Sequence, residues 1–209
     1  SVADISVRTV GLSLGFTREY RSDAASRYEE SSFGYGWTCN WDISLEFDSD
    51  GNIIFHDGEN ETVFQPNYYN SYTNADETGA ALTKNGASYK IAASDGTVYM
   101  FSSAGLLQNV TDSCGNKISC AYTGGKLVKL TDSNGRYLTL TWNEAGYIAS
   151  ITDSDGNTVA YTYDESGNLL TAGDAVYTYS ELWAHALTAA DKTVYGWNDS
   201  GLLASISEN

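Results

Sequence analysis

Residues 151–169 read ITDSDGNTVAYTYDESGNL, and this stretch decides the class of fold. Apolar Val159, Tyr161 and Tyr163 alternate with small or polar residues, which predicts a β-strand with one apolar face and one small polar face. A turn ending at Gly156 precedes the strand and a turn ending near Gly167 follows it; glycine supplies the positive φ that such turns need. We therefore predict a β-hairpin here.

The same unit recurs through the second half of the chain. An aliphatic residue, most often followed by Thr and a polar turn, marks its start at Ile91, Val110, Leu130, Ile151, Leu170, Leu187 and Ile206. The spacing is about 20 residues, which indicates a repeat architecture with one hairpin per repeat. We predict an all-β fold in which consecutive antiparallel hairpins span residues 86–209, including a degenerate hairpin over residues 183–191.

Each repeat carries an aromatic residue, and a glycine follows most of them. The structural repeat positions are Phe101, Tyr122, Trp142, Tyr163, Tyr179 and Trp197, with Gly105, Gly125, Gly146, Gly167 and Gly201. Apolar residues at strand spacing are typical of a core, so we expect the aromatic residues to line one covered face. In the returning strand, Ile148 and Ile151 are an odd number of residues apart and would face opposite sides of an ideal strand. Either a β-bulge or a strong local twist would reconcile them.

The first part of the chain is less regular. We expect residues 1–85 to form an N-terminal β cap or meander, with turns at residues 50–51 and 57–58. Residues 67–79 are polar and rich in Asn, so they predict an exposed loop. The hairpin array begins after this cap, at about residue 86.

The formal net charge of −16 limits the possible partners. The negative electrostatic field of so acidic a chain repels phosphate backbones and anionic membranes, so we expect no nucleic-acid partner. Solubility explains the charge, and a basic cargo or partner is the alternative. There is no apolar run long enough to cross a bilayer, which predicts no membrane insertion. Because Ser1 follows no Met, we expect the chain to be a piece of a longer protein.

No catalytic constellation stands out. The two histidines, His56 and His185, have no GxSxG-type serine motif beside them. The acidic residues fall mostly at turns, as Asp153 and Asp155 do, where carboxylates bond the local backbone. We therefore predict no catalytic residue, no cofactor and no enzymatic activity.

Two features of the sequence could indicate a metal or redox site. The DSDGN sequences at residues 48–52 and 153–157 suggest calcium but lack the length and final Glu of a calcium loop, so we predict plain turns and no metal. The three cysteines, Cys39, Cys114 and Cys120, give no closed disulfide framework and no zinc-type pair. Cys114 and Cys120 are either bridged to each other or free.

Several of these motifs resemble a known family. The sequence YTYDESGNL at residues 161–169 resembles the YD-repeat consensus, and Trp142-Asn143 and Trp197-Asn198 look like substituted versions of it. The sequences GLSLGFTREY at residues 11–20 and FGYGW at residues 33–37 resemble the start of the repeat-bearing shell of RHS proteins. The chain is therefore similar to the RHS/YD-repeat family, which includes bacterial wall-associated and teneurin-like proteins.

The resemblance implies a non-catalytic scaffold. In such proteins a curved or spiralling sheet forms a β-shell around a C-terminal toxin or effector of a secreted or cell-surface bacterial protein. The implied partner is the rest of the same polypeptide. The chain departs from a complete member in two ways: it holds too few repeats to close a shell, and it lacks the family's proline-containing self-cleavage motif, since Pro66 is its only proline.

A carbohydrate-binding or adhesin module is the alternative function. Aromatic residues can stack on sugar rings, and glycans would then be partners. Because the repeat aromatics are assigned to packing, the possible ligand-facing aromatics are those outside the repeats: Tyr68, Tyr69 and Tyr72.

Overall fold

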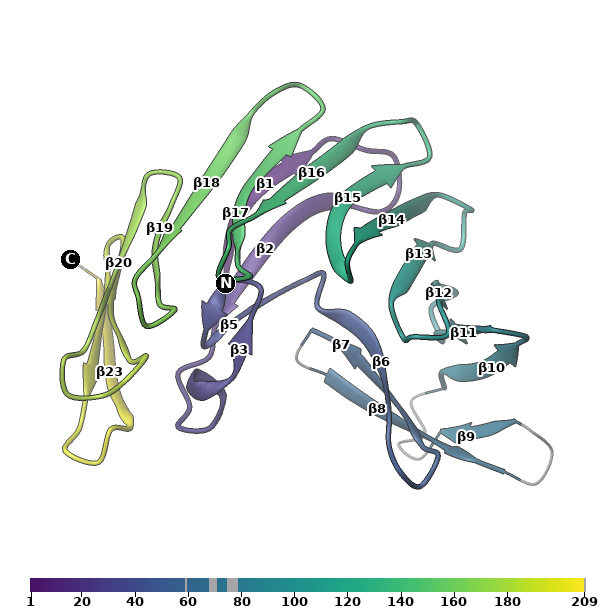
Figure 1. The fold of residues 1–209 in the computed structure, drawn as a ribbon, viewed down its shortest axis with the longest axis horizontal. Coiled ribbons are helices and arrows are strands. Elements are labelled where there is room, and N and C mark those ends of the chain that lie inside the picture. The colour runs from purple at the N-terminus through teal and green to yellow at the C-terminus, as the bar shows by residue number, and fades with distance from the viewer. Residues whose placement is uncertain (59, 68–70, 75–78, 209) are drawn as a thin grey trace. The chain divides into compact units, whose positions relative to one another are not determined.

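The computed structural model describes residues 1–58, 60–67, 71–74 and 79–208, and it is built of β-strands (Figure 1). The only helix in these residues is the 3-10 helix η1 (Ser26–Tyr28). The all-β prediction is confirmed.

Consecutive hairpins form one long antiparallel sheet, in which every strand neighbours the strands before and after it in sequence. Its strands are β10 (Ala81–Asn85), β11 (Ser88–Ala92), β12 (Val98–Phe101), β13 (Leu107–Thr111), β14 (Lys117–Thr123), β15 (Lys126–Asp132), β16 (Tyr137–Trp142), β17 (Ile148–Asp153), β18 (Thr158–Tyr163), β19 (Leu169–Ala172), β20 (Ala175–Tyr179), β21 (Leu187–Ala190), β22 (Thr193–Trp197) and β23 (Leu203–Glu208). The boundary expected at residues 85–86 falls in the turn between β10 and β11, the first two strands. Residues 180–186 form an irregular loop without helix, as expected for a degenerate hairpin.

The sheet contains a β-bulge beside the repeat aromatic residue. Thr162 pairs with Thr171, but Tyr163 pairs with Leu169, so Leu170 is an extra residue on the returning strand. The same shift occurs beside Phe101, Tyr122, Tyr179 and Trp197. A bulge turns the following side chains to the other face, which explains why Leu169 and Ala172, three residues apart, are both buried. Ile148 and Ile151 on β17, also three residues apart, are both buried.

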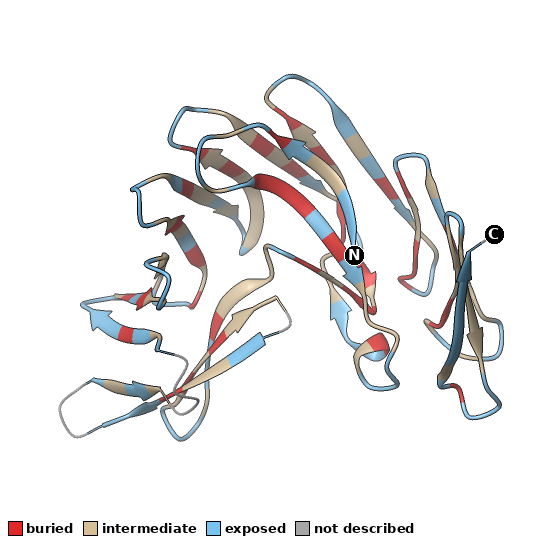
Figure 2. Cartoon of the chain, turned by 180° about the vertical axis from the view of Figure 1, so that it is seen from behind, coloured by how far each residue is buried: buried red, intermediate tan, exposed pale blue. Residues whose placement is uncertain are grey.

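The chain folds into two compact units, each built from separated segments. The first contains residues 1–5, 16–39 and 140–209. Its N-terminal strands are β1 (Val2–Val7), β2 (Leu14–Tyr20), β3 (Glu30–Ser31), β4 (Gly34–Tyr35) and β5 (Trp37–Cys39). Strands β1, β2 and β5 form a three-stranded sheet, and β3 pairs with β4. Figure 2 shows β2 as largely buried.

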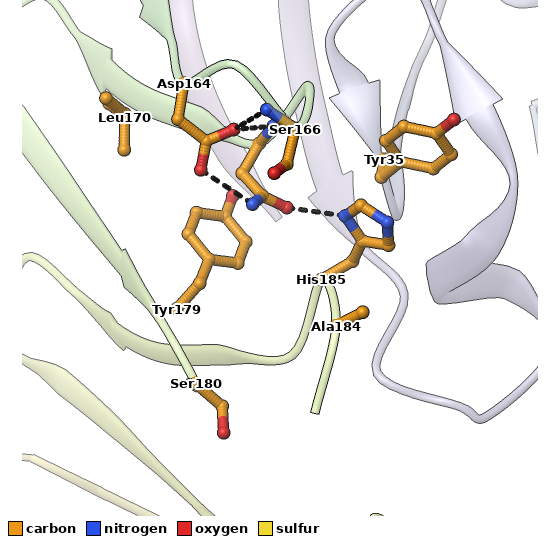
Figure 3. A pocket seen from close by; sticks show the side chains of 9 residues that line it. Tyr35, Asp164, Ser166, Leu170, Tyr179, Ser180, Ala184 and His185 are labelled. Atoms are coloured by element: carbon orange, nitrogen blue, oxygen red, sulfur yellow. Dashed lines mark hydrogen bonds between the residues drawn. The ribbon is translucent and has the colours of Figure 1, made fainter. Parts of the chain in front are cut away.

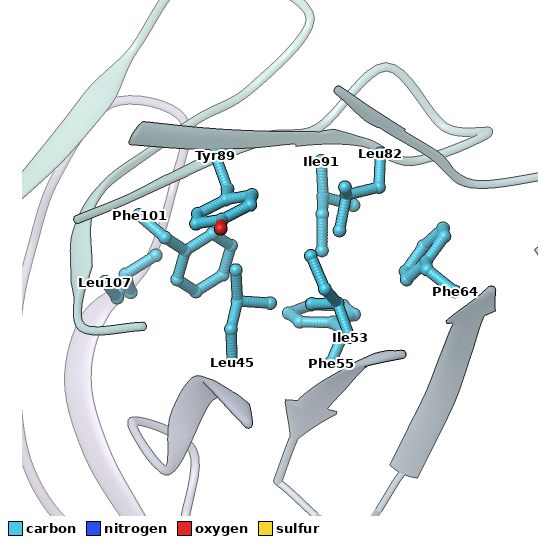
Figure 4. Close-up of a cluster of buried hydrophobic side chains, with 9 residues drawn as sticks. All are labelled: Leu45, Ile53, Phe55, Phe64, Leu82, Tyr89, Ile91, Phe101 and Leu107. Carbon is cyan, nitrogen blue, oxygen red and sulfur yellow. The ribbon is translucent and has the colours of Figure 1, made fainter. Parts of the chain in front are cut away.

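The second unit contains residues 6–15 and 40–139. A four-stranded sheet consists of β6 (Ile43–Phe47), β7 (Ile53–Asp57), β8 (Asn60–Pro66) and β9 (Tyr72–Asn74). Its buried side chains form one hydrophobic cluster with those of β10–β13 (Figure 4): Leu45, Ile53, Phe55, Phe64, Leu82, Tyr89, Ile91, Phe101 and Leu107. The Leu45 N–H donates a 2.9 Å hydrogen bond to the Gly105 carbonyl. Gly105 has φ +80°, and a Cβ there would lie 2.1 Å from the Leu45 carbonyl oxygen, so only glycine fits at this contact.

Candidate functional site

The structure places the repeat positions as follows. Phe101 is fully buried, whereas the other aromatic residues are half-buried: Tyr122, Trp142, Tyr163, Tyr179 and Trp197. The turn glycines all have positive φ: Gly105, Gly125, Gly146, Gly167 and Gly201. The half-buried aromatic residues pack against neighbours through part of their surface; Tyr163 lies 4.8 Å from Tyr147, centroid to centroid.

In the first unit, a buried arginine lies at the contact between the N-terminal segment and the repeats. Arg18 on β2 donates hydrogen bonds through Nε and Nη2 to the two carboxylate oxygens of Asp4, and through Nη2 to the Tyr177 hydroxyl at 3.1 Å. Tyr161 donates its hydroxyl proton to Asp4 at 2.9 Å. The pKa of Tyr161 is raised, first by burial and then by the Asp4 charge. Four rings surround the guanidinium at 4.7–5.5 Å: Phe33, Trp37, Tyr161 and Tyr177.

A second arginine makes a similar contact. Arg27, at η1, is buried and donates a 2.6 Å hydrogen bond from Nη1 to the Gly201 carbonyl. Its guanidinium lies 5.2 Å from the ring of Trp197, one of the repeat aromatics. Through Arg27, the N-terminal segment thus contacts both a turn carbonyl and a repeat aromatic residue.

Further hydrogen bonds continue this contact. Trp37 Nε1 donates to the Tyr179 hydroxyl at 3.0 Å, and Tyr147 donates to Glu30 Oε1 at 2.6 Å. The contact between this segment and the repeats was not predicted from the sequence. The signal was the alternation Leu14, Phe16, Arg18, Tyr20, which places Arg18 on the apolar face of β2.

The first unit also contains a polar pocket of about 500 Å³ beside His185. Its lining residues are Tyr35, Asp164, Ser166, Asn168, Leu170, Tyr179, Ser180, Ala184 and His185 (Figure 3). Asn168 Nδ2 donates to Asp164 Oδ2 at 2.8 Å, and Asn168 Oδ1 lies 2.7 Å from His185 Nδ1. The imidazole stacks on Tyr35 at 4.0 Å. Burial lowers the pKa of His185, which favours the neutral ring.

Neither histidine has the arrangement of a hydrolytic site. His56, in the second unit, lies 3.3 Å from both Glu46 and Glu61, with both carboxylates largely exposed. His185 contacts an amide instead of a carboxylate. Among the residues that the structure describes, no hydroxyl nucleophile is hydrogen-bonded to either ring.

The turn acids bond their own backbone, as the sequence predicted. Asp48 Oδ1 accepts the N–H groups of Asp50 and Asn52, and Asn52 Nδ2 donates to Asp48 Oδ2. Asp153 repeats this arrangement at residues 153–157. The Asn side chain and then the backbone N–H groups lower the pKa of both carboxyls. These two DSDGN sequences are turns closed by their own side chains.

The remaining candidate residues are the possible ligand-facing aromatics and the cysteines. Tyr68 and Tyr69 lie outside the described residues; Tyr72 is half-buried and packs on the core of the second unit. Cys39, Cys114 and Cys120 are free thiols. In the described ranges no group of three His, Cys, Asp or Glu side chains could hold a metal, and no helix is long and apolar enough to span a membrane.

Comparison with known families agrees with this architecture. A domain of unknown function, DUF6531, matches residues 1–64, and the RHS Repeat matches residues 122–158 and 148–179. No curated protein matches the chain. The fold and the matched segments define a β-hairpin repeat scaffold. Both families are typical of RHS/YD-repeat proteins, and the chain belongs to that family.

Proposed function

We propose that the chain is a non-catalytic part of a shell that encapsulates or displays a C-terminal toxin or effector of a larger secreted or cell-surface protein. The main support is the contact between the N-terminal segment and the repeats in the first unit. Arg18 and Arg27 together engage Tyr177, Trp197 and the Gly201 carbonyl. The apolar face of these hairpins is therefore used to hold the chain together, as a scaffold requires.

The opposite face of the same hairpins presents small hydroxyl side chains. Thr162 bonds Thr171 and Thr178 bonds Thr188 across neighbouring strands, at 2.7 and 2.8 Å. Such paired hydroxyls satisfy each other's hydrogen-bonding capacity. A surface of this kind can lie against a cargo without binding it tightly.

The proposed partners are further parts of the same polypeptide. In the described sheet, β23 is hydrogen-bonded to β22 alone, and Ile206 on it is 61% exposed. A strand edge with exposed apolar side chains favours pairing with another strand. We propose that additional repeats of the longer protein pair with β23.

Protease protection in the full-length polypeptide tests the encapsulation. We expect the C-terminal domain to resist a protease that digests it readily when it is expressed alone. The Arg18→Leu variant, which leaves Asp4 buried without its partner, should make it accessible. Arg8→Leu, at an exposed position of the N-terminal segment, is the control and should leave protection unchanged. A C-terminal domain digested equally fast in the wild-type protein and alone contradicts the proposal.

A further inference from the structure

The pocket beside His185 exists because one hairpin has a longer loop than its neighbours. In the preceding repeat, paired Tyr163 and Leu169 are six positions apart (169 − 163), whereas paired Tyr179 and Leu187 are eight apart (187 − 179). The two extra residues give an irregular loop at residues 180–186, which supplies Ser180, Ala184 and His185 to the lining.

His185 has a left-handed backbone conformation. Its φ is +58°, in the left-handed region that side chains with a Cβ seldom occupy. The Tyr20 hydroxyl donates to the His185 carbonyl at 2.5 Å and accepts the Leu187 N–H at 3.0 Å, which holds this backbone in place. Strained residues held by their surroundings are concentrated at binding sites.

Hydrogen bonds determine which imidazole nitrogen carries the proton. Asn168 donates through its amide nitrogen to Asp164, so its Oδ1 is the acceptor that faces His185. His185 Nδ1 therefore carries the proton and donates it to Asn168. In the neutral ring Nε2 is then an unprotonated acceptor.

The other polar groups of the pocket favour a positive charge. Asp164 Oδ2 accepts one hydrogen bond, from Asn168, and retains a lone pair. The lining contains the aromatic rings of Tyr35 and Tyr179, and none of its members in the described part of the chain is Lys or Arg.

We propose that this pocket binds a protonated primary amine. An ammonium group has three N–H donors, and the pocket offers the Asp164 carboxylate together with the hydroxyls of Ser166 and Ser180 as acceptors. Aromatic rings attract a cation, and a volume of about 500 Å³ is within the range of small-molecule sites. The amine is supplied by a free polyamine or by a lysine side chain of a basic polypeptide. This binding is independent of the scaffold function.

The two histidines make the binding directly observable, because the imidazole NMR signals of the whole chain come from His56 and His185 alone. We would titrate the protein with cadaverine, with Nα-acetyl-lysine methylamide and with the uncharged analogue 1,5-pentanediol. We expect the His185 signals to shift with one or both amines, which identifies the source, and the His56 signals to stay in place. Equal shifts with the diol, or no shift of His185 with either amine, would overturn the proposal.

An isosteric variant separates binding from folding. Asn occupies the position of Asp164 in two other repeats: Asn198 accepts the two corresponding backbone N–H groups, and Asn143 accepts the second of them. Asp164→Asn should therefore keep the turn, remove the charge and weaken amine binding about tenfold or more. Asp153→Asn makes the same change in a turn outside the pocket and should leave the affinity unchanged. Equal affinities for Asp164→Asn and the wild-type protein would refute the role of the carboxylate and with it the proposal.

Discussion

Arg18 donates two hydrogen bonds to the carboxylate of Asp4, and both side chains are withdrawn from solvent, with 0% and 3% exposure. Asp4 lies on β1 and Arg18 lies on β2, so the pair joins two strands of the N-terminal segment. Tyr161 and Tyr177, from the repeats, each add a hydrogen bond to it. The pair is consequently part of the contact between the segment matched by DUF6531 and the hairpins.

Replacing one member of this pair should destabilise the protein more than replacing both members with apolar residues. Asp4→Leu or Arg18→Met alone leaves a buried charge unpaired and should lower the free energy of unfolding by about 3–5 kcal/mol. The double variant should recover a large part of this loss. Urea unfolding of the wild-type protein, the two single variants and the double variant measures the coupling energy between the two side chains. As a control, Arg8→Leu, at an exposed site, should change the free energy of unfolding by less than about 0.5 kcal/mol. Strictly additive single losses would contradict the model of a buried pair.

The repeat aromatics should differ in their contribution to stability. Phe101 is fully buried in the cluster of the second unit, whereas Trp142 is half-buried. Phe101→Ala should cost about 3–5 kcal/mol and Trp142→Ala clearly less, because the cost follows the contacts and cavity left behind. Thermal unfolding of the two variants would show the order, and equal losses would mean that Trp142 is also a core residue.

Glycine at position 105 should be indispensable. An alanine Cβ would meet the Leu45 carbonyl oxygen, and the backbone has positive φ, so Gly105→Ala should prevent the β6 contact or unfold the second unit. Gly86→Ala is the matched control, since φ is +60° there but nothing lies within 4 Å of the new Cβ. The control should lose only about 1 kcal/mol, the usual cost of this conformation. Circular dichroism and chemical unfolding compare the two.

His185 should be neutral at pH 7 with its proton on Nδ1. Burial lowers its pKa below the ordinary value of 6.5, so the folded protein resists protonation of this ring more than the unfolded chain does. The linked stability is present above about pH 6.5 and is lost as the pH falls towards and through the folded pKa. Long-range ¹H–¹⁵N spectra report both tautomer and titration; a proton on Nε2 at pH 7 would be inconsistent with the Asn168 hydrogen bond.

The turn carboxylates should make the protein sensitive to acid. The pKa values of Asp48, Asp112 and Asp153 are lowered, first by the Asn side chain of each turn and then by backbone N–H groups. Their contribution is complete above the unfolded value of about 3.9 and is lost as the pH drops through the lowered folded values. Denaturant midpoints measured from pH 6 down to pH 2 should fall below about pH 4, and less so in the Asp153→Asn variant.

Local patterns were sufficient to predict the hairpins and their turns. Strands and turns depend on residues that are close in sequence. The alternation around Tyr161 and Tyr163 therefore predicts the strand directly, and the nearby glycines predict its turns. A β-bulge in the returning strand was one of two open alternatives, because a sequence shows the odd spacing of Ile148 and Ile151 but not the pairing of the strands. The contact between Arg18 and Tyr177 could not be predicted, since nothing in the local pattern specifies a partner so distant in the chain.

The pocket beside His185 could not be predicted from the sequence either, because no local pattern specifies it. His185 has no motif around it, and Asp164 and Asn168 belong to an ordinary repeat turn. Only the longer loop between Tyr179 and Leu187 departs from the pattern. An insertion marks where a site can form, but the hydrogen bond that orients the imidazole depends on the fold.

The separation in sequence between β2 and its partners has a consequence for synthesis of the chain. Each hairpin of the long sheet pairs with its immediate neighbour and can form as soon as it leaves the ribosome, because such contacts are local. Arg18 must instead wait until Tyr161 and Tyr177 have been made. During that interval the apolar side chains of β2 are without their final cover, so we expect this strand to be open to chaperones until the repeats have been made.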